Sequence, residues 1–404
     1  MTGTLHIVGA GLAGLAAAVA AAKSGSRVVV HEAAGHAGGR CRSFMDEKLD
    51  RVIDNGSHLV LGANRTTLAY AQATGGIEAM VAVDPCFPFV DLATGARWTV
   101  SPKRLPAGIG EILSALGLPW TWANETVASR LGRSRSFTRL WQPMCEAIMN
   151  TAPEDASARM FAWTMRKALL GGAAALTPWT FPLGLSAALV APALATLGSF
   201  GAEVHFRRRL LAATPDSLTF DTAEIRLTPN DRVILALPPW ALFAVLPGVW
   251  PEMPTRPIVN AHFRLDRPPV LPDKSHFLGL VNAAGHWLFL RGDVLSVTVS
   301  AADALAGRSN DDIAALLWDE AARAIGLPHA PLPPVRIMKE RRATLAHDEA
   351  TIARRPGPKT DFPTLFLAGD WIESPWPCTI EAAISSGLAA ARLATGRPTL
   401  AFGQ

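Results

Sequence analysis

A glycine-rich turn between a strand and a helix is the feature that most constrains the fold of this chain. Residues 4–8, TLHIV, are an apolar run typical of a buried strand, and residues 12–24 carry an alanine-rich helical pattern. Residues 27–31, RVVVH, are a second buried strand by their continuous β-branched run. Together the three segments predict a βαβ unit with parallel strands.

The turn itself, VGAGLAG, has glycine at positions 9, 11 and 14. Gly9 permits a tight turn, Gly11 lets the backbone approach a pyrophosphate, and Gly14 allows the helix to pack closely on the sheet. The amides that follow, at Leu12 and Ala13, lie at the positive end of the helix dipole and favour bound phosphate. The turn therefore indicates a phosphate-binding site.

A carboxylate at the end of the second strand makes this indication more specific. Glu32 follows Gly14 by 18 residues, where a carboxylate accepts hydrogen bonds from ribose hydroxyls. The glycine pattern alone is weak in a chain so rich in alanine and glycine. With Glu32 it predicts a dinucleotide-binding site.

Two further motifs fit the same site. In GHAGGRCRS, residues 35–43, Gly39 and Arg40 fit a turn where backbone and guanidinium meet phosphate charge, although Arg40 could also be an ordinary surface arginine. Near the other end, FLAGDW places Gly369 and Asp370 at the close of an apolar strand, where Asp370 could bind a ribityl chain. Asp370 could equally be a turn or helix-capping aspartate.

A helix begins about ten residues after this aspartate, in CTIEAAISSG, residues 378–387. Its N-terminus, at Thr379 and Ile380, could direct backbone amides at an electron-poor ring.

The order of these segments predicts an α/β fold with a discontinuous nucleotide-binding domain. We assign residues 1–80, 201–255 and 346–404 to it, because each contains buried strands and helical patterns. Residues 81–200 and 256–345 form the predicted substrate domain, since the second of these alternates as strands of a mainly antiparallel sheet.

An uncharged stretch, residues 168–202, is long enough for a membrane span but is interrupted by prolines and glycines. We expect a broken helical segment that lines an apolar channel or lies in a bilayer interface, with Trp163, Trp179 and Phe181 as interfacial aromatics. Arg166 and Lys167, directly before the stretch, could meet phospholipid headgroups. The alternative is an ordinary buried helix pair.

Composition narrows the class of protein. With 404 residues the chain is too long for one core, and its net charge of +4 is a weak bias that predicts no nucleic-acid partner. Its four cysteines lie far apart, so they predict reduced thiols and no metal site. No basic region precedes the apolar N-terminus, so we expect no signal peptide and a cytoplasmic protein, in contact at most with the inner face of the membrane.

Taken together, the motifs resemble a known family. VGAGLAGLAAAVAAAKSGSRVVVHEAAGHAGGR, VILALPPW and AGDW followed by TIEAAISSG are similar, in order and spacing, to the FAD-binding amine oxidase and phytoene desaturase superfamily. The resemblance spans nearly the whole chain. It implies FAD as the cofactor, a Rossmann-like FAD-binding domain in three pieces, an α+β substrate domain over the isoalloxazine ring, and cofactor contacts at Gly56 and at the Leu210 backbone.

A narrower resemblance is to the hydroxysqualene dehydroxylase family, the squalene-associated flavoenzymes of hopanoid synthesis. It is carried by DNGSHLVLGAN, LWQPMCEAIMNTAPEDASARMFAWTMRKAL, ALPPWALFAVLPG and IVNAHFRL. It implies that a C30 isoprenoid alcohol loses its allylic hydroxyl, with hydride from reduced FAD. Two departures, Ala382 where glycine is common and the aromatic segment IESPWPC, leave substrate detail open.

Enzymes that remove a hydroxyl group usually protonate it with a general acid as it leaves. His58 is the first candidate because the family's chain passes near the flavin there, although a structural histidine bonded to backbone is the more common case. Glu381 and the single tyrosine, Tyr70, are weaker candidates, and Glu381 could instead cap or form a salt bridge at the start of its own helix.

Three other functions stay open. An oxidative isoprenoid desaturase would run hydride towards the flavin, an amine oxidase would need an aromatic cage where Thr379 stands, and a prenyl carrier would have lost FAD. The sequence has no second glycine fingerprint, so we expect electrons from a transiently bound nicotinamide or a separate reductase.

Overall fold

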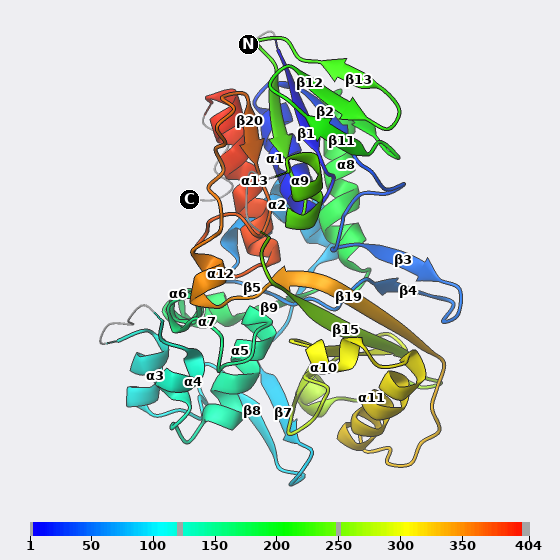
Figure 1. Ribbon diagram of the computed structural model, residues 1–404. Helices are drawn as coiled ribbons and strands as arrows, with labels where there is room; N and C mark the ends of the chain where they lie inside the picture. Colours follow the sequence, from blue (N-terminus) through cyan, green and yellow to red (C-terminus); the bar gives the residue numbers. More distant parts are fainter. Residues whose placement is uncertain (1–2, 119–123, 248–251, 398–404) are drawn as a thin grey trace.

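A five-stranded parallel sheet, in the order β10-β2-β1-β14-β20, organises the upper half of the molecule (Figure 1). It belongs to a computed structural model that describes residues 3–118, 124–247 and 252–397. The strands come from three separated stretches of the chain, as the predicted fold class requires. They are β1 (Thr4–Val8), β2 (Arg27–His31), β10 (Glu203–His205), β14 (Arg232–Leu235) and β20 (Leu365–Leu367).

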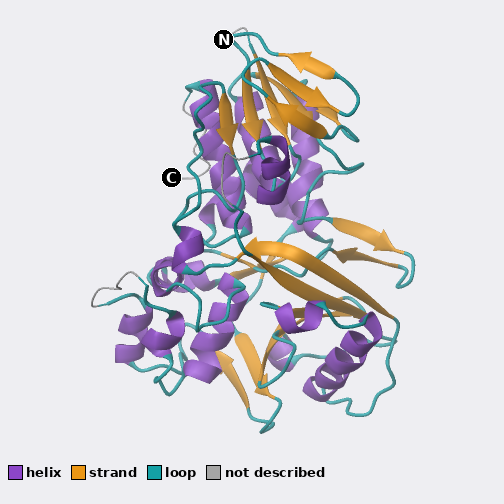
Figure 2. Cartoon of the chain, in the orientation of Figure 1, coloured by secondary structure: helices purple, strands orange, loops and turns teal. Residues whose placement is uncertain are grey.

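Different layers cover the two faces of this sheet because its side chains alternate. Ile7 and Ile234 face a core formed with helices α1 (Leu12–Lys23), α2 (Arg65–Thr74), α8 (Ala191–Ser199) and α13 (Ile380–Thr395). Val8 and Leu235 face the three-stranded sheet β11 (Leu210–Ala213), β12 (Ser217–Phe220) and β13 (Glu224–Arg226), together with α9 (Pro239–Val245). The result is a three-layer unit (Figure 2).

The lower half is built on a seven-stranded sheet in the order β19-β15-β18-β17-β16-β7-β8. All of its pairs are antiparallel except β16 with β7, so the predicted mainly antiparallel sheet is confirmed. The strands are β7 (Phe87–Asp91), β8 (Arg97–Val100), β15 (Thr255–Arg264), β16 (Phe277–Val281), β17 (Trp287–Arg291), β18 (Val294–Val299) and β19 (Val335–Leu345).

Helices pack on both faces of this sheet as well. Leu278 and Leu280 of β16 share a core with α10 (Asp303–Ala306) and α11 (Asn310–Ala324). Phe277 and Val281 of the same strand face a helical lobe, the helices between residues 109 and 169. The lobe contains α3 (Ile109–Ala115), α4 (Val127–Leu131), η2 (Phe137–Trp141), α5 (Gln142–Met149) and α6 (Ala158–Leu169).

Short elements connect the two halves. A hairpin of β3 (Ser43–Asp46) and β4 (Arg51–Asp54) projects from the right of Figure 1, and β5 (Val60–Leu61), β9 (Pro178–Thr180) and β6 (Val81–Ala82) form a small sheet. The remaining elements are η1 (Gly76–Ala79), α7 (Gly172–Leu176), η3 (Ser186–Val190), η4 (Pro272–Lys274) and α12 (Glu349–Ile352).

The uncharged stretch 168–202 is broken, as its prolines and glycines predicted, into α7, β9, η3 and α8. Its second half packs in the same core as α1: Phe181 is 7% exposed, and Leu189 and Leu197 are fully buried. Phe181 is therefore a core residue rather than an interfacial one. No helix in the described part of the chain is long and apolar enough to cross a membrane.

This packing bears on the predicted domain limits, which stay a prediction. A boundary at residue 200 would divide one hydrophobic core, because η3 and α8 pack with α1 rather than with the lower sheet. A division at about Phe181 keeps that core whole.

Candidate active site

The three glycines of the first turn meet three different surroundings. A Cβ on Gly9, whose φ is +104°, would lie 2.4 Å from the Ala236 carbonyl oxygen, and one on Gly14 would lie 1.9 Å from the Gly9 carbonyl oxygen. A Cβ on Gly11 would meet no atom within 4 Å. Gly9 and Gly14 are thus required by the protein's own packing, whereas Gly11 faces open space that a ligand can fill.

A second glycine turn lies directly opposite. Gly38 forms a bridge with Gly11, and its amide donates to the Ala10 carbonyl at 2.8 Å. Gly39 adopts a φ of +56°, and a Cβ there would lie 3.4 Å from the Gly11 Cα. Two backbone segments without side chains therefore line the same open space.

Unpaired amides and a fixed carboxylate complete this side of the site. Helix α1 has Gly11 as its N-cap and no side chain that bonds its first amides, so those of Leu12 and Ala13 are available to an anion. Glu32 accepts from the Ala10 amide and the Ala34 amide, each at 2.7 Å. Its carboxylate is held beside the turn and keeps lone pairs for ribose hydroxyls.

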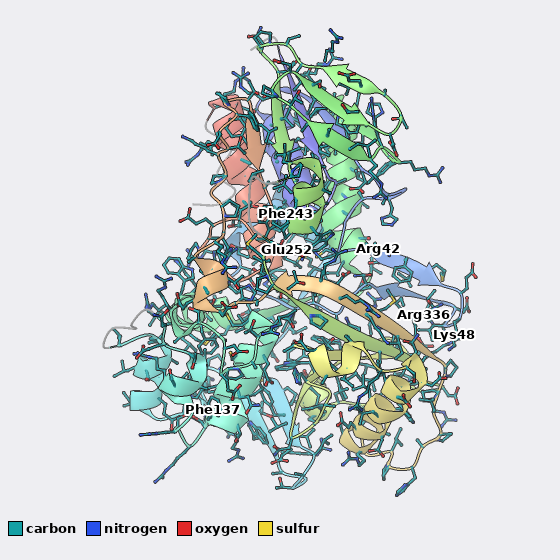
Figure 3. All side chains as sticks on the ribbon, in the orientation of Figure 1. Arg42, Lys48, Phe137, Phe243, Glu252 and Arg336 are labelled. Carbon is teal, nitrogen blue, oxygen red and sulfur yellow. The ribbon has the colours of Figure 1, made fainter. Side chains whose placement is uncertain are left out.

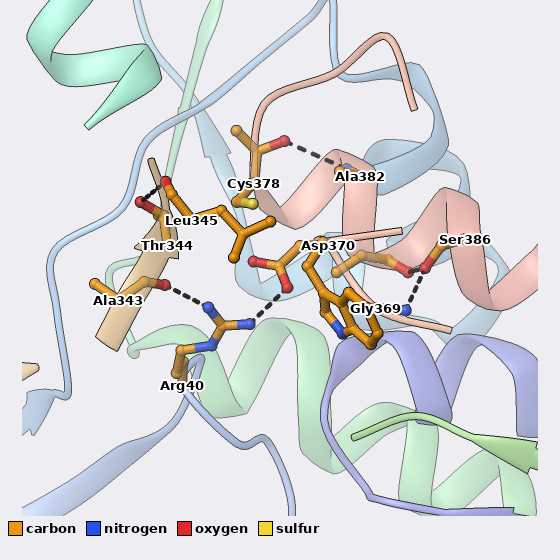
Figure 4. A network of polar contacts seen from close by, with 12 residues as sticks. Arg40, Ala343, Thr344, Leu345, Gly369, Asp370, Cys378, Ala382 and Ser386 are labelled. Carbon is orange, nitrogen blue, oxygen red and sulfur yellow. Dashed lines mark hydrogen bonds and ion pairs between the residues drawn. The ribbon is translucent and has the colours of Figure 1, made fainter. Parts of the chain in front are cut away.

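Arg40 and Asp370 form an ion pair that joins two distant parts of the chain (Figure 4). Arg40 Nη2 donates to Asp370 Oδ1 at 2.7 Å, and Nη1 donates to the Ala343 carbonyl on β19. Although burial disfavours the charged form, Asp370 raises the pKa of Arg40 above its ordinary value. Arg40 is thus no free surface arginine, and Asp370, 6% exposed, is no simple turn residue.

The N-terminus of α13 is capped from within. Thr379 Oγ1 accepts from the Ala382 amide at 3.3 Å, and Ile380 is the first helical residue. A Cβ on Gly387, further along α13, would lie 2.0 Å from the Ala13 carbonyl oxygen, so α13 packs tightly on α1. The Gly369 amide donates to Ser386 Oγ at 2.8 Å and ties the aspartate loop to α13 (Figure 4).

The remaining predicted cofactor residues lie at two edges of this arrangement. Leu210 begins β11, 7% exposed, in the sheet that covers the second face of the parallel sheet. Gly56 lies against the lower sheet, where its Cβ would be 3.2 Å from Asn260 Nδ2.

His58 lies between the two halves. Its Nδ1 is 2.8 Å from the Gly56 carbonyl oxygen, and its ring contacts the Cys41 thiol, one residue after Arg40. Burial alone would lower the pKa of His58, but Cys41, the Gly56 carbonyl and Asp54 raise it to about 9. These contacts favour the charged imidazolium over the neutral ring.

Asp54, which the sequence reading did not single out, fixes the segment that carries His58. Its carboxylate accepts from Ser43 Oγ at 2.5 Å, from Arg291 Nη1 at 2.6 Å and from the Leu185 amide at 3.1 Å. These partners come from β3, β17 and the residue before η3, so one side chain links the upper and lower halves.

The two weaker acid candidates have structural roles. Glu381 accepts from the Thr66 amide at 3.0 Å and from the Thr67 amide at 2.8 Å, so it caps the N-terminus of α2. Tyr70 is fully buried and donates to the Leu189 carbonyl at 3.0 Å.

Two residues that hold the aromatic segment 371–378 were also missed. Arg355, 6% exposed, donates to the carbonyls of Asp370, Trp376 and, at 3.1 Å, Trp371. His347 Nδ1 contacts the Met149 carbonyl, and its Nε2 accepts from the Cys378 amide at 2.8 Å. Because their partners are backbone atoms, no sequence motif marks them.

Together the geometry defines an α/β fold whose glycine turns and Glu32 suit a dinucleotide, with a buried histidine, His58, at the joint between its two halves. The chain matches the family described as flavin containing amine oxidoreductase over residues 12–395. It belongs to that family, and the cofactor is FAD. The predicted family and cofactor are confirmed.

Among solved structures, a triple mutant of putrescine oxidase superposes with a TM-score of 0.72 at 16% identity, covering 98% of this chain and 100% of the other. Cyclohexylamine oxidase from Brevibacterium oxydans gives a TM-score of 0.72 at 16% identity, covering 97% and 99%. At such identities the likeness establishes the fold alone.

Curated relatives place the chain more narrowly. It is 38% identical to the hydroxysqualene dehydroxylase of Rhodopseudomonas palustris, over 98% of this chain and 100% of the relative. The hydroxysqualene dehydroxylase of Zymomonas mobilis is 32% identical over 96% of this chain and 98% of its own. The chain therefore belongs to the hydroxysqualene dehydroxylase family, as its motifs predicted.

Proposed function

We propose that this enzyme converts hydroxysqualene to squalene by replacing an allylic hydroxyl with hydrogen. The observation that carries the proposal is the end-to-end likeness to hydroxysqualene dehydroxylases. The glycine turns, Glu32 and the ion pair of Arg40 with Asp370 lie in the nucleotide-binding half of the chain and support it. The substrate is then a C30 isoprenoid alcohol, and the products are the alkene and water.

Different residues are proposed to hold each part of FAD. Amides of Leu12 and Ala13, with Gly11 and Gly39 opposite, suit the pyrophosphate, and Glu32 suits a ribose. We assign the adenine to the Leu210 backbone, the ribityl chain to Gly369 and Asp370, and the ring to Gly56, Thr379 and Ile380.

When bound and reduced, FAD supplies the hydride that replaces the hydroxyl. His58 supplies the proton: its imidazolium donates to the leaving oxygen, the carbon–oxygen bond breaks, and water departs. The Gly56 carbonyl and Asp54 keep the ring charged and oriented. The apolar core of the helical lobe keeps water from the developing allylic cation.

Because the proposed substrate is a hydrocarbon alcohol, we also propose that the enzyme works at a membrane surface on the cytoplasmic side. We propose further that an external reductant or reductase reduces FAD. A hydrocarbon substrate dissolves in the bilayer and has to enter from there. The buried second half of 168–202 makes that half unsuitable for the contact.

An anaerobic single-turnover experiment tests the reaction. The purified enzyme is photoreduced, hydroxysqualene is added, and the flavin absorbance is followed while lipids are extracted. Reoxidation of the flavin with stoichiometric squalene supports the proposal. Bleaching of oxidised enzyme by a saturated isoprenoid would instead establish a desaturase.

A further inference from the structure

Large aliphatic side chains are exposed on the helical lobe although a soluble surface would bury or replace them. Ile109 is 79% exposed, Leu170 is 70%, Leu118 is 50% and Leu113 is 44%. Ile109 and Leu113 lie one turn apart on α3, so they share one face of that helix.

Hydrogen bonds bring these side chains to one surface. Arg166, in the last turn of α6, donates to the Leu116 carbonyl at 2.7 Å, just past the end of α3. Leu170 follows one turn later, and its amide donates to the Arg166 carbonyl at 3.0 Å. The end of α3, with Leu118, and the end of α6, with Leu170, therefore meet at one joint, which we call the α3–α6 face.

The charge around this face is positive. Exposed cations lie close in sequence to the elements of this face, at Lys103, Arg104, Arg133 and Lys167. Residues 101–170 carry nine basic and five acidic side chains, an excess equal to the net charge of the whole protein, +4.

The acidic side chains nearest the face are engaged within the lobe. Glu111 accepts from the Arg135 amide at 3.2 Å and from Ser136 Oγ, and Glu125 pairs with Arg130 at 2.9 Å. The charge presented outward is thus mainly cationic.

The α3–α6 face lies close to the segment that carries His58. Helix α7 begins two residues after Leu170, and its Ala175 carbonyl accepts from the Ala63 amide at 2.9 Å. The strand that follows α7, β9, pairs with β5, which begins two residues after His58. One short helix therefore separates the face from the candidate acid.

We propose that the α3–α6 face docks the enzyme on an anionic phospholipid surface, where its aliphatic side chains enter the interface and its cations meet headgroups. The combination of exposed apolar side chains with an excess of exposed lysine and arginine in the same region of the chain matches the apolar and anionic layers of such a surface. The inference rests on the proposed function, because a bilayer-dissolved substrate gives the contact its purpose.

The test is vesicle binding by the FAD-loaded enzyme. We expect binding to phosphatidylcholine vesicles that contain phosphatidylglycerol, and weaker binding without it or at high salt. The double variant Ile109→Ser/Leu170→Ser should bind the anionic vesicles at least about tenfold more weakly, since each leucine-sized side chain loses its apolar transfer energy.

The matched control is Met45→Ser/Val52→Ser on the β3–β4 hairpin, where the two side chains are 60% and 44% exposed. The hairpin, near the labelled Lys48, projects on the opposite side of the molecule from Phe137 of the lobe (Figure 3). Equal loss in both variants, or vesicle binding unchanged by Ile109→Ser/Leu170→Ser, would overturn the proposal.

Two readouts separate lipid docking from a failure of the proposed reaction and from a protein interface at the same face. Turnover of detergent-dissolved substrate should be the same in wild type and both variants, so a failure there would count against the proposed reaction and not against the face. A dimer in size-exclusion chromatography that the Ile109→Ser/Leu170→Ser variant dissolves would identify the face as a protein interface instead and refute the lipid assignment.

Discussion

At the scale of single residues, glycines that look equivalent in a motif differ in what they do. Gly14 is required because its missing Cβ leaves room for the Gly9 carbonyl, whereas the missing Cβ of Gly11 leaves room only for a ligand. A binding role and a folding role can therefore be separated by substitution.

We expect Gly14→Ala to destabilise the protein by about 1–3 kcal/mol or more, because a methyl group 1.9 Å from a carbonyl oxygen forces the helix away from the sheet. Gly11→Ala should leave the thermal midpoint of the FAD-free protein unchanged and weaken FAD binding by about tenfold or more. Thermal unfolding and flavin titration measure the two effects. Equal destabilisation by both variants would contradict the separation.

His58 gives a prediction in pH. A group that donates its proton must be charged, so turnover should fall as pH rises through about 9, the raised pKa of His58. His58→Gln should lower kcat by about 10²–10⁴-fold while FAD content stays full. An unchanged kcat in this variant would remove His58 from the mechanism.

A variant at Cys41 tests what raises the pKa of His58. The thiol is the largest of the contacts that raise the pKa of His58, so Cys41→Ala should move the alkaline limb of the kcat profile to lower pH. A purely structural role for Cys41 would lower kcat evenly at all pH values and leave the limb in place.

At the residue level, sequence reading singled out Arg40 and Asp370 because each lies in a motif that suits FAD, and their roles toward FAD stay a prediction. The ion pair between them was not predicted. Arg355 and His347 escaped notice because carbonyls and amides accept or donate anywhere in a chain, so nothing in the sequence marks a residue that bonds to them.

At the scale of helices and strands, α13 stabilises α2 through one carboxylate. Glu381, 3% exposed, accepts the second and third amides of α2 across 315 and 314 residues of sequence. Such a cap is invisible in sequence, because a local capping residue was available at Asn64 and makes no side-chain bond to the helix.

We therefore expect Glu381→Gln to lower the free energy of unfolding by about 1–3 kcal/mol, since a buried charged acceptor is lost, with kcat changed little. Chemical denaturation and steady-state kinetics distinguish the outcomes. A large fall in kcat with unchanged stability would restore Glu381 as an acid candidate.

Three neighbouring strands also share a column of histidines. His6 of β1, His31 of β2 and His205 of β10 stack with ring centroids 5.5 Å and 5.8 Å apart, and Arg208 lies close by. Burial, His6, Arg208 and His205 lower the pKa of His31 to about 3, so the ring stays neutral in the folded protein.

Stability should consequently depend on pH below neutrality. Since the unfolded chain binds the proton near pH 6.5 and the folded one near 3, the stabilisation by neutral His31 is complete above about pH 6.5. It is lost as pH falls towards 3, by up to about 5 kcal/mol. Denaturation curves of wild type and His31→Phe between these pH values check it. Parallel curves would show that His31 does not contribute.

At the scale of helices and strands, the sequence predicted where strands form better than it predicted which core the apolar helices pack in. The β-branched and alternating runs indicated the strands of the parallel sheet and, in the lower sheet, those within residues 256–345, because side-chain period reports burial directly. They missed β7 and β8, which lie in a region where helical patterns were expected. The packing of η3 and α8 on α1 was missed, since a uniformly apolar segment such as 185–197 suits any core and does not specify which.

At the scale of the whole molecule, the proposed FAD contacts come from parts of the chain that are far apart in sequence. These contacts lie at residues 9–14, 32, 39–40, 369–370 and 379–380. Removal of FAD should lower the unfolding midpoint by several degrees, because a ligand at about 100 times its Kd adds about 2.7 kcal/mol.

Differential scanning of FAD-depleted and reconstituted protein measures this shift. A midpoint that does not move with FAD concentration would indicate that the two halves are already rigidly joined, for example through Asp54 and Arg291.

The order of the parallel sheet has a consequence for which lengths of the chain can bind the cofactor. The strand β20 and the helix α13, which pack on β14 and α1, follow the other strands and helices of the described chain in sequence. The glycine turn lies near the start of the sequence, whereas the groups that would hold the other end of the cofactor lie within residues 369–380, about 360 residues further along the chain. Because the proposed FAD contacts lie on both sides of this separation, a chain cut before Asp370 should fail to retain FAD.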